Sequence, residues 1–118
     1  MVLYLAVTSV TAALNAFFAV ADLARSKFVL ETSGSVGVPS SWLPTLGVLK
    51  GAGAVGLLAG ILGARWVGVA AATGLVLFFV GAMVAHVRAR QIATMVFPAT
   101  MGLLAGASLS LAIVAMET

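Results

Sequence analysis

Four long apolar stretches divide the chain, and each is close to the length that a helix needs to cross a membrane. They cover about residues 1–22, 42–64, 66–86 and 92–116. A helix crosses the hydrocarbon core of a bilayer with about 20 predominantly apolar residues. The pattern therefore predicts an all-α membrane protein, a single domain over residues 1–118 built as an antiparallel bundle of four transmembrane helices.

The connections between these stretches are short, apart from a polar loop over residues 23–41 that is rich in serine and glycine. Short connections make consecutive helices antiparallel, so this loop and the connection between the third and fourth helices share one side of the membrane. Four basic residues lie on that side, against Arg65 on the other. The four are Arg25, Lys27, Arg88 and Arg90. Since positive residues favour the cytoplasm, we expect both termini to be extracytoplasmic.

Composition supports a membrane location and excludes a water-covered surface, because 63% of the residues are hydrophobic and only 8% are charged. The six Lys and Arg residues outnumber the three Asp and Glu residues, but they stand at the ends of apolar runs and form no basic face. We therefore expect membrane lipids and no nucleic acid as partners. Arg88 and Arg90 are expected to bind lipid headgroups.

The chain contains no cysteine and a single histidine, His86. Disulfides, thiol chemistry and iron–sulfur ligation by this chain are therefore excluded, and so is a haem held by two of its own histidines. A zinc site would need carboxylates that are scarce here. We expect no metal site, no catalytic residue and no cofactor within the chain, and we do not expect it to act as an enzyme on its own.

Lys50 is the charge that interrupts the second apolar stretch. At 100° per residue the glycines of this stretch fall on two edges, Gly53, Gly56, Gly60 and Gly63 on one and Gly47 and Gly51 on the other. Lys50 lies between the two close-packing edges, so it is expected to face protein, and an ionisable residue within a span indicates a functional site. Two interpretations remain open: Lys50 extends to the membrane interface, or it pairs with Asp22.

Asn15 stands seven residues before Asp22 and therefore on the same face of the first helix, two turns deeper. Asn15, Asp22 and Lys50 are thus expected to form a polar seam between the first two helices. His86 ends the third helix on the same side of the membrane and is expected either to complete this ligand-binding seam or only to cap its own helix.

Four short segments give the chain a family resemblance. They are NAFFAVADL at residues 15–23, the pair Val38-Pro39, LGVLKGAGAVGLL at residues 46–58 and AMVAHVR at residues 82–88. In these segments the chain resembles the DoxX-like family of small four-helix bacterial membrane proteins. The resemblance implies a multi-pass protein of the bacterial inner (plasma) membrane. It also implies a quinone or lipid pocket, or a role as a small subunit beside redox partners.

The sequence is compatible with three functions from different classes. The first is a lipid- or quinone-binding or accessory subunit of a membrane complex, respiratory or redox, in which the seam holds the ligand. The second is a small transporter of an anionic or neutral ligand, since the charge within the spans is positive. The third is a quinone-linked oxidoreductase subunit, whose cofactors a partner would carry. Glycine-rich helices also favour a homo-oligomer or a larger membrane complex.

Overall fold

The computed structural model describes residues 1–24, 30–31, 34, 37 and 39–117. Its elements are, in chain order, α1 (Val2–Leu23), the 3₁₀ turn η1 (Ser40–Trp42), α3 (Leu43–Ile61), α4 (Arg65–Arg88), the 3₁₀ turn η2 (Ala93–Met95) and α5 (Val96–Glu117). In the described part of the chain, four α-helices are long and apolar enough to cross a membrane. The predicted all-α bundle is confirmed, and the protein is a multi-pass membrane protein.

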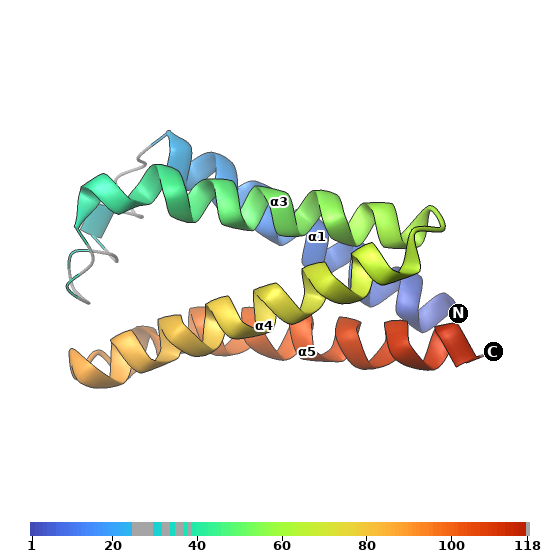
Figure 1. The fold of residues 1–118 in the computed structure, drawn as a ribbon. Coiled ribbons are helices and arrows are strands. Elements are labelled where there is room, and N and C mark those ends of the chain that lie inside the picture. Colours follow the sequence, from blue (N-terminus) through green and yellow to red (C-terminus); the bar gives the residue numbers. More distant parts are fainter. Residues whose placement is uncertain (25–29, 32–33, 35–36, 38, 118) are drawn as a thin grey trace.

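The four helices form a bundle in which each helix packs mainly against two others. α1 lies against α3 and α5, and α4 closes the ring between α3 and α5. Figure 1 shows both termini at one end of the bundle, together with the turn between α3 and α4. We call this the termini end, and we call the opposite end, where α1 ends and α4 is joined to α5, the loop end. The antiparallel order follows from the short connections.

Two helix ends differ by more than two residues from the expected bounds, each for a local backbone reason. α3 ends at Ile61 rather than near residue 64, because Gly63 has a φ of +126°. This left-handed conformation suits glycine, so Gly63 makes the turn and does not extend the packing edge on which we had placed it. α5 begins at Val96, four residues later than expected, and Pro98 thus falls in its first turn, where a missing N–H removes no helix bond.

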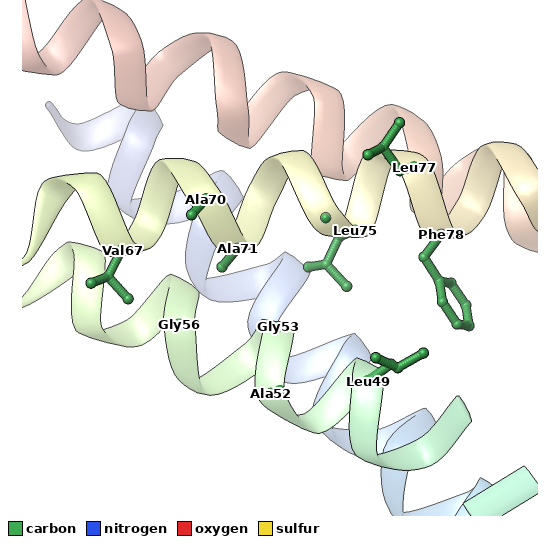
Figure 2. A pocket seen from close by; sticks show the side chains of 11 residues that line it. Leu49, Ala52, Gly53, Gly56, Val67, Ala70, Ala71, Leu75, Leu77 and Phe78 are labelled. Atoms are coloured by element: carbon green, nitrogen blue, oxygen red, sulfur yellow. The ribbon is translucent and has the colours of Figure 1, made fainter. Parts of the chain in front are cut away.

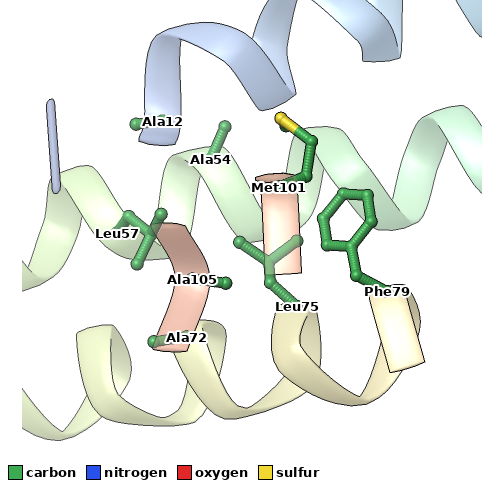
Figure 3. Packing of buried hydrophobic residues seen from close by; sticks show 8 residues of the cluster. All are labelled: Ala12, Ala54, Leu57, Ala72, Leu75, Phe79, Met101 and Ala105. Atoms are coloured by element: carbon green, nitrogen blue, oxygen red, sulfur yellow. The ribbon is translucent and has the colours of Figure 1, made fainter. Parts of the chain in front are cut away.

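Small residues let the helices approach closely, and larger side chains fill the remaining core. Figure 3 shows Leu57, Leu75, Phe79 and Met101 packed among four alanines at the centre of the bundle. The alanines are Ala12, Ala54, Ala72 and Ala105. Without a strong hydrophobic force between helices in lipid, such close packing is what holds the bundle together.

The two glycine edges of α3 pack against two different helices. A Cβ atom added to Gly47 would lie 3.0 Å from the carbonyl oxygen of Ala19 in α1. On the other edge, a Cβ added to Gly60 would lie 2.7 Å from the Cα of Gly68 in α4. The expectation that these glycines serve packing is confirmed for both edges. Lys50, which lies between the edges, is therefore directed towards the space that α1 and α4 border.

Candidate ligand-binding site

Lys50 forms an ion pair with Asp22 at the loop end of the bundle. Its Nζ atom lies 2.8 Å from Oδ2 of Asp22, and the exposed fractions of the two side chains are 15% and 2%. Asp22 is the penultimate residue of α1, so the carboxylate lies near the level at which that helix leaves the membrane. Of the two interpretations left open by the sequence, pairing with Asp22 is the one that the structure supports.

Two phenylalanine rings border the ammonium group of Lys50. Its Nζ atom lies 5.8 Å from the ring centroid of Phe18 in α1 and 5.5 Å from that of Phe78 in α4. A cation over an aromatic face is attracted by the ring quadrupole, the more so where water is excluded. The ammonium is thus held by three side chains from the two helices that flank α3.

Asn15 is fully buried but belongs to a different group of polar side chains. Its Nδ2 atom donates a hydrogen bond to the carbonyl oxygen of Thr11 at 2.9 Å, while its Oδ1 atom is buried with no partner among the described residues. Neighbouring polar contacts join α1 to α5, with Oγ1 of Thr8 2.7 Å from Oγ of Ser108. The structure therefore divides the expected seam into an ion pair and a deeper polar row.

Thr8 and Thr11 were not among the expected site residues, although their spacing carries a signal. Thr8, Thr11, Asn15 and Asp22 are all buried and follow one another at intervals of three, four and seven residues. These intervals repeat on one face of a helix, so tracing polar residues at helical spacing would have found the row. Its partner Ser108, one hundred residues away in sequence, has no such signal.

We expect the Thr8–Ser108 hydrogen bond to contribute modestly to stability. In a double-mutant cycle of Thr8→Val and Ser108→Ala, the coupling free energy should be about 0.6 kcal/mol and no more than about 1.7 kcal/mol, as for other hydrogen bonds between membrane helices. Unfolding of detergent-solubilised protein with SDS, followed by circular dichroism, measures it. Ser110→Ala is the matched control, because the exposed Ser110 donates its hydrogen bond to the carbonyl oxygen of Gly106 in its own helix. Additive single effects would contradict this expectation.

His86 is buried in the last turn of α4 and contacts its own helix. Its Nδ1 atom lies 2.8 Å from the carbonyl oxygen of Ala82, and its exposed fraction is 5%. Nε2 is buried without a hydrogen-bond partner in the described part of the chain. No hydrogen bond or ion pair joins His86 to Asp22 among the described residues, so the local contact fits the interpretation in which His86 serves its own helix.

Arg88 and Arg90, the two residues expected to bind lipid headgroups, both lie at the loop end. Arg88 is the last residue of α4, Arg90 follows in the turn with a φ of 59°, and both are exposed. Their binding of headgroups stays a prediction. Arg25 and Lys27, which contributed to the expected orientation, lie outside the described residues.

An apolar groove of about 640 Å³ runs between α3 and α4. Figure 2 shows Val67 over Gly56 at one part of the groove and the side chains of Phe78 and Leu49 facing each other where the two helices separate. Towards the termini end the groove is closed by the contact of Gly60 with Gly68. The remaining lining residues are Ala52, Gly53, Ala70, Ala71, Gly74, Leu75 and Leu77.

The wide part of the groove lies beside the ion pair. Phe78 both lines the groove and borders the Lys50 ammonium, and Leu49 precedes Lys50 in the chain. An apolar channel that ends at a charged, hydrogen-bonding group can receive a molecule with an apolar chain and a polar head. The ion pair and the groove together form the candidate site.

Comparison with known proteins agrees with the resemblance of the short segments. The model of the DoxX-like family matches residues 6–108, a range that contains Asp22, Lys50 and the whole groove. Searches of curated proteins and of solved structures gave no match. Because the family model matches most of the chain, this protein belongs to the DoxX-like family.

Proposed function

We propose that this protein binds one membrane amphiphile, a lipid or a quinone, with its apolar chain in the groove between α3 and α4 and its polar head at Lys50. The observation that carries the proposal is the position of Phe78, which is shared by the groove and by the ammonium group of Lys50. This shared residue makes one continuous site of two features that would otherwise be unrelated.

The groove suits a single flexible chain. Its volume of about 640 Å³ lies within the range of about 300–1,000 Å³ that is common for small-molecule sites. Its walls carry only apolar side chains and glycines, and Leu49 and Leu77 are more than half exposed at its edges. A chain would therefore enter sideways from the surrounding lipid, and dispersion contacts along the walls would hold it.

The ion pair suits a head with oxygen acceptors. An ammonium group carries three N–H donors, and Asp22 accepts one of them among the described contacts. A carbonyl or ester oxygen can accept another, and a flat ring can stack on Phe78. Both a lipid ester and a quinone meet these requirements. A bound quinone would supply redox chemistry, whereas the residues of this chain would only hold and orient it.

The remaining parts of the proposal concern the surroundings of the site. We propose that the loop end of the bundle lies at the cytoplasmic face of the inner membrane, because Arg88 and Arg90 lie there, and Arg25 and Lys27 belong in the sequence to the segment that joins α1 to α3. We also propose that the chain works in a homo-oligomer or as an accessory subunit of a larger complex. Its helices offer small residues, such as Gly81, whose surroundings are open in the single chain.

Native mass spectrometry of the protein in a mild detergent tests the proposal. We expect a co-purifying lipid or quinone, and we expect Gly74→Leu to lower the affinity for it about tenfold, a loss of about 1.4 kcal/mol, which appears as a reduced occupancy. Gly74 lines the groove and a Cβ there meets no atom within 4 Å, so the larger side chain fills the groove without disturbing the helices. The same spectra report subunits that co-purify.

Gly106→Leu is the matched control, because Gly106 also has open surroundings but lies on α5, away from the groove. Equal losses in both variants, or an occupancy that Gly74→Leu leaves unchanged, would contradict the proposal. A partner helix released by Gly74→Leu would show instead that the groove is a protein interface.

A further inference from the structure

The composition of the ion pair limits which headgroups can approach Lys50. Nζ of Lys50 lies 2.8 Å from Oδ2 of Asp22, and Asp22 is 2% exposed. The carboxylate is therefore a fixed neighbour of any group that binds the ammonium from the groove. Because the pair as a whole carries no net charge, an entering anion would meet a repulsion from Asp22 that offsets most of its attraction to Lys50.

A neutral acceptor avoids this conflict. An anionic head would also have to lose its water on entering a site bordered by the rings of Phe18 and Phe78, and the cost is large for an uncompensated charge. A carbonyl oxygen loses much less hydration and can still accept an N–H from Lys50. The site thus favours a neutral head even though the residue that contacts it is a cation.

We propose that Asp22 is a specificity-determining residue, which restricts the site to amphiphiles with a neutral, oxygen-bearing head and rejects anionic ones. This inference rests on the proposed function, since it names the class of ligand that the same site takes. Specificity of this kind comes from a repulsive element built against the wrong ligand rather than from an added attraction to the correct one. The position of Asp22 beside Lys50 is that element.

Two probes with the same chain and different heads test the inference. Methyl hexadecanoate carries a neutral ester, and hexadecane-1-sulfonate carries an anion that stays ionised at all accessible pH values. Native mass spectrometry at equal mole fractions in detergent reports the occupancy of each. We expect the wild-type protein to bind the ester about tenfold more tightly than the sulfonate, and we expect Asp22→Asn to reverse this order, because Lys50 then acts as an isolated cation.

Further variants separate a specificity role from a structural one. In the double variant Asp22→Asn with Lys50→Met, both charges are absent. The ratio of bound ester to bound sulfonate should then equal the ratio in which the two probes enter detergent micelles without protein. Circular dichroism and a single elution peak establish that each variant is folded. If Asp22→Asn does not fold, the order of binding in the wild-type protein decides the question, because a lysine without a selecting carboxylate would bind the sulfonate more tightly than the ester.

The outcomes distinguish this inference from the function on which it rests. If both probes bind the wild-type protein equally, or the sulfonate binds more tightly, Asp22 does not select the head, while the groove remains a chain site provided that Gly74→Leu weakens both probes. If neither probe binds and no amphiphile co-purifies, the proposed function fails and this inference fails with it. An ester preference that persists in the double variant would also overturn it.

Discussion

Replacing Lys50 with methionine should lower the free energy of unfolding by about 3 kcal/mol, the largest effect that we expect from a single substitution in this chain. Methionine keeps most of the volume and the flexible stem of lysine, so the packing between α1, α3 and α4 is retained. What is lost is the partner of the Asp22 carboxylate, whose side chain is only 2% exposed. An uncompensated charge at such a site is far more costly than the absence of both charges.

Unfolding with SDS in mixed micelles, followed by circular dichroism, measures this loss. The double variant Asp22→Asn with Lys50→Met is the control, and it should recover most of the lost stability because neither charge remains. A loss below about 1 kcal/mol in Lys50→Met would indicate a pair no stronger than an exposed surface ion pair. In that case the ammonium would not be held in the position that the proposed site requires.

Replacing Gly60 with alanine should lower stability by about 2–3 kcal/mol, although it adds a single methyl group. The new Cβ would lie 2.7 Å from the Cα of Gly68, a backbone atom that cannot move away without separating α3 from α4. On intrinsic preference alone, alanine would stabilise a helix by about 0.8–1 kcal/mol relative to glycine, so the steric cost must exceed this gain. The same unfolding assay gives the value.

Gly74→Ala is the matched control for this experiment, because Gly74 lies in α4 but a Cβ there meets nothing within 4 Å. This variant should be neutral or slightly more stable than the wild-type protein. Similar behaviour of Gly60→Ala and Gly74→Ala would show that the crossing of α3 and α4 is looser than the contact of Gly60 with Gly68 indicates. The groove would then lack its closed end.

Much of the architecture could be predicted from sequence because the membrane constrains it strongly. Every backbone N–H and C=O group in the hydrocarbon core must be bonded within the segment, so an apolar run of about 20 residues has few alternatives to a helix. Lys50 was informative for a related reason. A charge within a span requires a partner, and Asp22, at the end of the first helix, was the carboxylate on the same side that stood within reach of Lys50.

The sequence by itself thus determined the four helices, their antiparallel order, the direction of Lys50 and the packing role of Gly47 and Gly60, because each depends on helical periodicity or on the solvation of a single group. The tertiary structure alone decided which polar groups meet. It joined Thr8 to Ser108, separated Asn15 from the ion pair and opened the groove beside Phe78. Such contacts depend on the rotation of each helix about its axis and on the distance between neighbouring helices. Many side chains determine these two quantities together, so no local sequence pattern predicts them.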